Sequence, residues 1–257
     1  MKHTYTLPSG GVYAPYLLEM VEGNHTLIAG TVGAGKSVLE NSIIYAMLST
    51  RFPGQTADGR GARFVLIDPK KVELVMYKNL PHTLFYADNT PDIVDVLHKV
   101  RSLIDDRFRR MQSKGQRKTD DCPVYVFIDE LVDLVTHRKY GKEITALLSD
   151  IASISRACSV FIVALTQSPA RIIIPAQFKL LFNCRVGLRC NNAIESRQII
   201  DDDSAVSLPR HGLGIVQQNL DRYQIKIPFY SDEEINTIVR HWTKQKSPVG
   251  RWLARMA

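Results

Sequence analysis

Residues 27–40 read LIAGTVGAGKSVLE, a short apolar run that meets three glycines, a lysine and a serine before apolar residues return at helical spacing. Residues 30–37 fit the pattern G-x-x-x-x-G-K-[ST] without a gap. Glycines let successive backbone N–H groups turn inward and form a nest for an anion, and the helix that follows adds its positive end. The stretch therefore predicts a strand at 24–30, a phosphate-binding loop and a helix at 36–50.

The loop predicts an ATP site that uses Mg²⁺. Lys36 is expected to reach the β- and γ-phosphates, and the hydroxyl of Ser37 is expected to hold the metal ion. A glycine-rich turn without chemical importance is the alternative, and the strand before the loop and the helix after it count against that alternative. The residues expected to surround the nucleotide are Gly30, Thr31, Val32, Gly33, Ala34, Gly35, Lys36, Ser37 and Val38.

A second motif is acidic. In VYVFIDE, at 124–130, an apolar strand ends with two carboxylates. Asp129 at the strand tip can hold the water shell of Mg²⁺, and Glu130 can polarise a water for attack on the γ-phosphate. The alternative is an acidic start of a helix. Asp68 ends another strand and either tunes Mg²⁺ or caps a loop, while Thr166 and Gln167 end a third strand, where a polar side chain can sense the γ-phosphate or simply begin a turn.

The remaining pattern predicts an α/β fold. Continuous apolar strands alternate with amphipathic helices, which is typical of a mostly parallel sheet with helices on both faces. The predicted strands are 62–70, 122–130, 159–167, 185–189, 213–217 and 223–228. The predicted helices are 91–111, 141–157 and 231–242, the last with Ser231 as its N-cap.

Composition indicates a cytoplasmic protein without a membrane span. The chain has 257 residues, of which 45% are hydrophobic, and its formal net charge of +7 favours a polyanionic partner without establishing one. The N-terminus lacks the apolar core of a signal peptide, and no stretch approaches the roughly 18 apolar residues of a membrane span. The four cysteines, at 122, 158, 184 and 190, have no zinc-site spacing, so we expect buried free thiols.

Five segments in order resemble a known family. LIAGTVGAGKSV, RFVLIDPKKVEL, VYVFIDELVDL, SRACSVFIVALTQSP and CRVGLRCNNAIESRQIID are similar to the motor domains of the FtsK/SpoIIIE family, which are RecA-like hexameric DNA pumps of the HerA/FtsK superfamily. The resemblance runs from about residue 22 to residue 242. It implies a RecA-like P-loop NTPase core that hydrolyses ATP and acts on double-stranded DNA as a homo-oligomeric ring, most often a hexamer.

The resemblance also implies roles for single residues. Lys36 and Ser37 fall on the Walker A pair, Asp129 and Glu130 on the Walker B aspartate and the catalytic glutamate, and Gln167 on the polar sensor.

Family members complete each site with an arginine of the neighbouring subunit. Arg185 is the favoured candidate, with Arg156 and Arg197 as others. Pairing with a carboxylate at a strand edge is the alternative for Arg185.

Departures from the family pattern set the expected domain organisation. We expect an N-terminal lead-in at 1–22, an ATPase domain at 23–243 and a basic tail at 244–257, without the extra domain, membrane helices or winged helix of longer members. The serine of TQSP replaces the more usual arginine of the family. Stand-alone cores of this kind resemble proteins of mobile elements and phages.

Two basic segments are candidates for contacts to DNA phosphates, which need no sequence specificity. The first, at 107–118, contains Arg107, Arg109, Arg110 and Lys114, and the second, after the sensor strand, contains Arg171 and Lys179. A solvated surface is the alternative for the first segment, and packing on a neighbouring subunit is the alternative for the second.

Three other functions stay open at this stage. A related ATPase that moves protein cargo, as in secretion systems, shares the core. A nucleotide-gated adaptor in DNA processing would bind a partner without pumping. A small-molecule kinase would need to exclude water and offer an acceptor pocket, and the second acid after Asp129 suits hydrolysis better.

Overall fold

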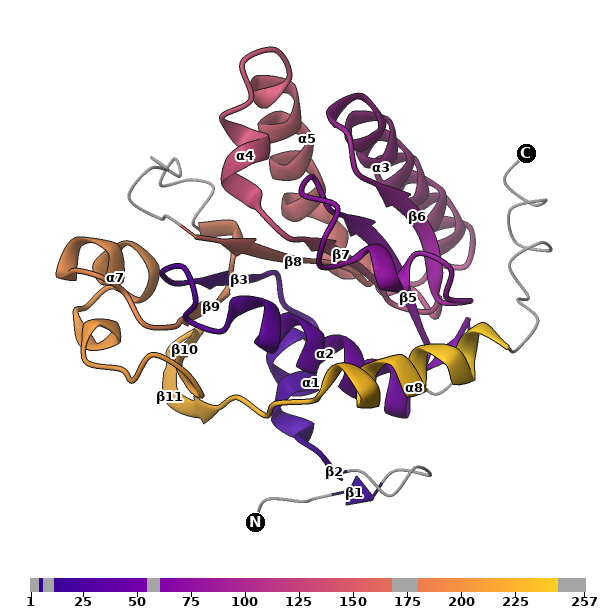
Figure 1. Ribbon diagram of the computed structural model, residues 1–257. Coiled ribbons are helices and arrows are strands. Elements are labelled where there is room, and N and C mark those ends of the chain that lie inside the picture. The colour runs from indigo at the N-terminus through magenta and orange to yellow at the C-terminus, as the bar shows by residue number, and fades with distance from the viewer. Residues whose placement is uncertain (1–4, 7–11, 55–60, 168–179, 245–257) are drawn as a thin grey trace.

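The computed structural model describes residues 5–6, 12–54, 61–167 and 180–244, and its centre is a twisted sheet (Figure 1). The order of strands is β11-β10-β9-β3-β8-β7-β5-β4, with β6 also beside β5, which makes a nine-stranded sheet within the described residues. These strands are β3 (Thr26–Ala29), β4 (Phe52–Pro53), β5 (Gly61–Ile67), β6 (Thr83–Ala87), β7 (Val124–Ile128), β8 (Val160–Thr166), β9 (Cys184–Gly187), β10 (Leu213–Gln218) and β11 (Asp221–Lys226). A separate ladder joins β1 (Tyr5–Thr6) to β2 (Val12–Tyr13).

The centre of the sheet is parallel, as the sequence predicts. Strand β3 pairs in parallel with β8 and β9, β8 with β7, and β7 with β5, while β10 and β11 are antiparallel additions at one edge. The register places Ala29 beside Thr166 and Ile67 beside Ile128. The carboxyl ends of four strands therefore meet at one edge, and the residues that follow them are brought together.

Helices cover both faces of the sheet (Figure 1). One face carries α3 (Thr90–Ser113), α4 (Leu131–Val135) and α5 (Gly141–Ile154), and the other carries α1 (Pro15–Val21), α2 (Lys36–Thr50) and α8 (Asp232–Thr243). Helix α7 (Ala193–Ile200) packs beside β9 and β10, and short 3₁₀ turns lie at Val75–Tyr77, Ser155–Cys158 and Ser204–Val206. The described chain thus has three layers, which confirms the predicted α/β class.

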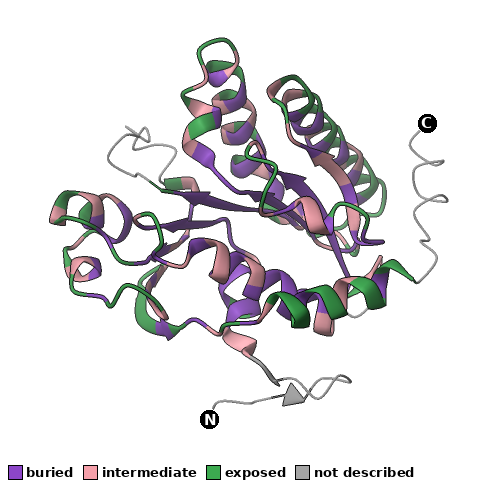
Figure 2. Ribbon diagram, in the orientation of Figure 1, coloured by how far each residue is buried: buried purple, intermediate pink, exposed green. Residues whose placement is uncertain are grey.

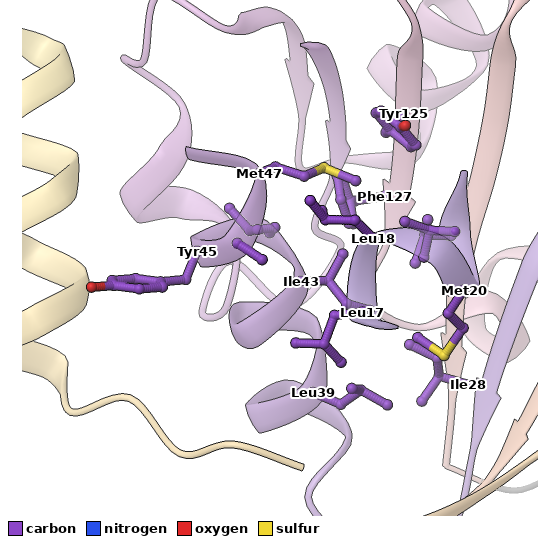
Figure 3. Packing of buried hydrophobic residues seen from close by; sticks show 14 of the residues in the cluster. Leu17, Leu18, Met20, Ile28, Leu39, Ile43, Tyr45, Met47, Tyr125 and Phe127 are labelled. Atoms are coloured by element: carbon purple, nitrogen blue, oxygen red, sulfur yellow. The ribbon is translucent and has the colours of Figure 1, made fainter. Parts of the chain in front are cut away.

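Two apolar cores sandwich the sheet. The central strands β3, β5, β7 and β8 are buried along their whole length and purple in Figure 2, and the helices show purple toward the sheet and green toward solvent. In the core beneath α2, the side chains of Leu17, Ile43 and Met47 lie between the helices and the sheet (Figure 3). Because these side chains are at most 1% exposed, each contributes about 1.5–3 kcal/mol of apolar burial.

Several local predictions are confirmed by the structure. Helix α2 has the predicted bounds, and α8 begins with a capping box in which Ser231 Oγ accepts from the N–H of Glu234 while Glu234 Oε2 accepts from the N–H of Ser231. All four cysteines are buried and free. Among the described residues, no helix has the length and hydropathy that would suit a membrane crossing.

Candidate functional site

The glycine-rich loop joins β3 to α2 at the carboxyl edge of the sheet. Gly33 and Gly35 have φ values of +72° and +95°, a region that side chains with a Cβ rarely adopt. Gly30 is needed for space, because a Cβ there would lie 2.8 Å from Cβ of Leu188. Gly35 is the N-cap of α2 and provides no side-chain cap, so the first N–H groups of the helix face the loop without a side-chain acceptor.

Lys36 is folded back over the loop. Its Nζ donates to the carbonyl oxygens of Gly30 and Thr31, both at 2.9 Å. The side chain is buried, and this burial lowers the pKa of Lys36 to about 8, while the negative charges of Glu130 and Asp129 act in the opposite direction. The ammonium therefore lies within electrostatic reach of the acid pair, across the site from β7.

Asp129 follows β7 and is 6% exposed. Burial raises the pKa of its carboxyl to about 6; Lys70 opposes the shift, and Asp68, Glu73 and Glu130 increase it. Its Oδ2 has no hydrogen-bond partner within the described structure. A buried carboxylate oxygen without a partner is costly, and a cation beside it would remove that cost.

Glu130 is held at both carboxylate oxygens. Its Oε2 pairs with Lys70 Nζ at 3.1 Å, and its Oε1 accepts from the backbone N–H of Gln167 at 3.3 Å. The carboxylate is buried, whereas Lys70 is about one third exposed. Two groups from the ends of different strands thus fix the acid that is a candidate for activating water.

Asp68 and Thr166 occupy the same edge with different surroundings. Both oxygens of Asp68 accept backbone N–H groups, from Val72 at 3.3 Å and Leu74 at 3.0 Å, so this residue caps the loop after β5. Thr166 is fully buried, and its hydroxyl has no partner among the described residues. Of the two alternatives for Asp68, loop capping is the one seen here, and Thr166 offers a free polar group to the site.

The candidate arginines for a neighbouring site lie in different surroundings. Arg185 lies on β9, and its Nη2 pairs with Asp201 Oδ2 at 2.6 Å. The side chain of Arg185 is 14% exposed. Arg197 pairs with Asp203 at 3.3 Å and is well exposed. Arg156, in the 3₁₀ turn before β8, is also exposed. The pairing of Arg185 matches the alternative that the sequence left open.

The basic segment at 107–118 requires one correction. Arg107 is 2% exposed, and its guanidinium donates to the carbonyl oxygens of Cys158 at 2.5 Å and Cys122 at 2.6 Å. Assigning Arg107 to a DNA contact was therefore wrong, because its charge is used to join α3 to the amino ends of β7 and β8.

The other three candidates for DNA contacts in this segment, Arg109, Arg110 and Lys114, are at the surface. Arg109 pairs with Asp106, Arg110 with Asp121 and Lys114 with Asp120. This loop precedes β7 and lies at the amino edge of the sheet, opposite the glycine-rich loop. The second predicted DNA segment, with Arg171 and Lys179, lies outside the described residues.

Comparisons with known proteins agree with this geometry. The model of the FtsK/SpoIIIE family matches residues 1–124. A DNA translocase FtsK of Brucella melitensis biotype 1 is 26% identical over 279 residues, covering 91% of this chain and 33% of its own. One from Caulobacter vibrioides is 28% identical over 278 residues, with the same coverage.

The chain is thus similar to the FtsK/SpoIIIE family over residues 1–124 and to FtsK proteins over about nine tenths of its length. This confirms the resemblance seen in the sequence. The chain spans about a third of the length of the curated FtsK relatives that it matches.

Solved structures of other proteins share the fold of this chain. The pCW3 conjugation coupling protein TcpA, determined as a monomer with ATPγS, has a TM-score of 0.74 at 19% identity, covering 93% of this chain and 70% of that one. The cytoplasmic domain of the type VII secretion ATPase EccC of Thermomonospora curvata has a TM-score of 0.70 at 17% identity, covering 95% of this chain and 31% of that one. These similarities confirm the RecA-like P-loop ATPase fold.

Two residues of the site were given no role from sequence alone. Lys70 belongs to the quoted segment RFVLIDPKKVEL, and its place two residues after a strand-end aspartate was a usable signal. Arg210 lies beside the glycine-rich loop although it is remote in sequence. No local pattern marks Arg210, because only the tertiary fold brings it to the loop.

Proposed function

We propose that this chain is the ATP-hydrolysing motor part of a double-stranded DNA translocase. The observation that supports it best is that two parts of the site lie at the same edge of the sheet. One is the glycine-rich loop with the buried Lys36, and the other is the acid pair Asp129 and Glu130, whose charges act on Lys36. The relatives named DNA translocase FtsK supply the substrate class.

In this proposal each half has a separate task. The backbone N–H groups of residues 30–38 bind the phosphates, and Lys36 places its charge on the β- and γ-phosphates. Glu130 orients a water and takes its proton as the water oxygen attacks the γ-phosphorus, while the bond from that phosphorus to the β–γ bridging oxygen breaks and ADP leaves. Lys70 and the N–H of Gln167 keep that carboxylate in place, so neither needs to touch the nucleotide.

The residues at the site fit a magnesium ion. Asp129 Oδ2 and Thr166 Oγ1 are buried polar atoms without partners in the described structure, and oxygen ligands are those that Mg²⁺ prefers. Ser37 and Asp129 would hold the ion, which when bound would supply positive charge to the phosphates. The buried carboxylate of Asp129 is then no longer uncompensated.

Ring assembly and an arginine acting between subunits are further parts of the proposal. Arg156 is exposed and not bound to a carboxylate in the described structure, whereas Arg185 already pairs with Asp201 and Arg197 with Asp203. For Arg185 to act on a neighbour's nucleotide, its ion pair with Asp201 would have to open. A hexamer that threads duplex DNA, in a mobile element or phage, is the arrangement that we propose.

Contacts to DNA would be made to phosphates and not to bases. Arg109, Arg110 and Lys114 are the described candidates, and each already has an aspartate partner that a phosphate would replace. Exposed ion pairs contribute only about 0–1 kcal/mol, so such an exchange has a low cost. Arg171 and Lys179 remain candidates from the sequence.

A second candidate function is a motor with protein cargo. It is favoured by the shared fold of the secretion ATPase EccC. A nucleotide-gated adaptor is a third, in which nucleotide is bound but hydrolysis is not needed for action.

The test is ATP hydrolysis with and without duplex DNA over a series of salt concentrations. We expect DNA to raise the rate several-fold at low salt, with an apparent affinity that falls steeply as salt rises. A rate that DNA leaves unchanged at every salt concentration would reject the DNA motor and leave the protein-cargo motor. If the chain still binds its partner and acts on it after Glu130→Gln, this would indicate the adaptor.

A further inference from the structure

The guanidinium of Arg210 rests against the glycine-rich loop. A Cβ built on Gly33 would lie 3.3 Å from Arg210 Nη2 and 3.7 Å from Nε. Arg210 is exposed and, within the described residues, forms no hydrogen bond or ion pair. A second cation is thus placed at the phosphate loop, on the part of the loop that follows Val32.

The fold fixes the segment that presents Arg210. Leu208 is 5% exposed and belongs to a small apolar cluster with Ala29, the last residue of the strand that enters the loop. The carbonyl oxygen of Leu208 accepts from Arg189 Nη1 at 2.7 Å. The carbonyl oxygen of Arg189 accepts from the N–H of Thr31 at 2.9 Å. One residue therefore joins the 208–210 segment to the loop.

Electrostatics indicates what this arginine binds. The loop N–H groups, the start of α2 and Lys36 supply positive charge on the loop side of the site, and Arg210 adds another positive charge without a carboxylate partner in the described structure. An anion held in the loop would be favoured by this positive charge. Guanidinium groups bind phosphate through two parallel N–H donors, which makes a phosphate chain the fitting ligand.

We propose that Arg210 binds the phosphate chain of the nucleotide held by the loop of its own chain. Arg189 is the positioning residue, since it ties the segment of Arg210 to Thr31. This inference rests on the proposed function. It adds a phosphate-binding residue in cis, separate from any arginine that a neighbouring subunit provides.

The experiment is a fluorescence titration with a slowly hydrolysed ATP analogue and with ADP. The proteins compared are the unmodified chain, Arg210→Ala, Arg210→Lys and, as a matched control, Arg240→Ala on α8, which is exposed and remote from the loop. We expect Arg210→Ala to raise the Kd for the ATP analogue about tenfold or more, with partial recovery in Arg210→Lys and no change in Arg240→Ala. The melting temperature of Arg210→Ala without nucleotide should stay unchanged.

The possible results distinguish a failure of the Arg210 assignment from a failure of the proposed ATPase function. An unmodified chain that binds no nucleotide would overturn both. A chain that binds nucleotide equally well with and without Arg210 would overturn this inference alone. A loss seen only at protein concentrations where the chain self-assembles would assign Arg210 to a neighbouring site and overturn the assignment in cis.

Discussion

Lys70 Nζ lies 3.1 Å from Glu130 Oε2, and the two residues follow neighbouring parallel strands, β5 and β7. The N–H of Gln167, after β8, binds the other oxygen of the same carboxylate. The acid that we assign to water activation is thus positioned from three strands. Because such positioning sets the angle and distance of the attacking water, the supporting residues affect rate more than binding.

The first prediction concerns this support. Lys70→Met should lower the kcat of ATP hydrolysis by about tenfold to a hundredfold, with a much smaller change in KM, because the carboxylate loses one of its two anchors. Lys71→Met is the control, since Lys71 is 60% exposed and pairs with Asp88 instead. Steady-state kinetics of both variants provide the measurement. Equal rates in the two variants would show that the Lys70–Glu130 pair has no part in positioning.

The second prediction concerns Glu40, which is 0% exposed and has no partner for either carboxylate oxygen in the described structure. Burial first, and then the charges of Asp129, Glu73 and Asp68, raise its pKa well above the ordinary value of 4.5. The protonated form is the one that the fold favours. Its contribution to stability is therefore complete below pH 4.5 and is lost as pH rises toward the raised pKa.

Urea unfolding over a pH series checks the behaviour of Glu40. Glu40→Leu should raise the free energy of unfolding near pH 8 by about 1–3 kcal/mol and flatten its fall with rising pH, because a buried polar group without partners is removed. Glu40→Gln keeps the size of the side chain and should flatten the fall without the full gain. A steeper fall with pH in either variant would contradict the assigned protonation.

The third prediction concerns space at Gly30. Gly30→Ala should destabilise the chain by about 1–3 kcal/mol and weaken nucleotide binding, because its Cβ would meet the Cβ of Leu188, which cannot rotate away. Gly23→Ala serves as the control. Nothing lies within 4 Å of its added Cβ, and its φ of +77° predicts only a cost of about 1 kcal/mol, with nucleotide affinity intact. Nucleotide affinity lost equally in both variants would contradict the steric explanation.

The fourth prediction separates folding from DNA binding in the basic segment. Arg107→Ala should lower the free energy of unfolding by about 2–4 kcal/mol, because it leaves buried carbonyl groups without a donor. Arg109→Ala should change stability by less than about 0.5 kcal/mol and should reduce the salt dependence of DNA binding. Chemical unfolding and DNA titrations give the two readings. A stable Arg107→Ala with weakened DNA affinity would reverse these roles.

Much of the fold could be predicted because its signals are local. Glycines before Lys36 mark the start of α2, and the sequence placed this helix at its observed bounds. Helix α1 was not predicted. Its seven residues are too few to show a helical period, and its position depends on packing of Leu17 and Met20 into the core.

The site was predicted in its motifs and not in its supporting contacts. Arg107 lies on the buried face of α3 together with Val100, Leu103 and Ile104. Its helical spacing therefore indicated burial, whereas its charge favoured an exposed position. Arg210 depends on the tertiary contact of Arg189 with Leu208. Such a contact between distant segments leaves no periodic trace in the chain.

The most direct measurement is phosphate release and ATP binding on the same samples of the unmodified chain and Glu130→Gln. We expect Glu130→Gln to bind ATP as tightly as the unmodified chain, because the loop residues bind the phosphates. We expect it to release phosphate at least about a hundredfold more slowly, because Glu130 removes the proton of the attacking water. Phosphate release at an unchanged rate in Glu130→Gln would contradict the proposed function, and so would an unmodified chain that binds ATP without hydrolysing it.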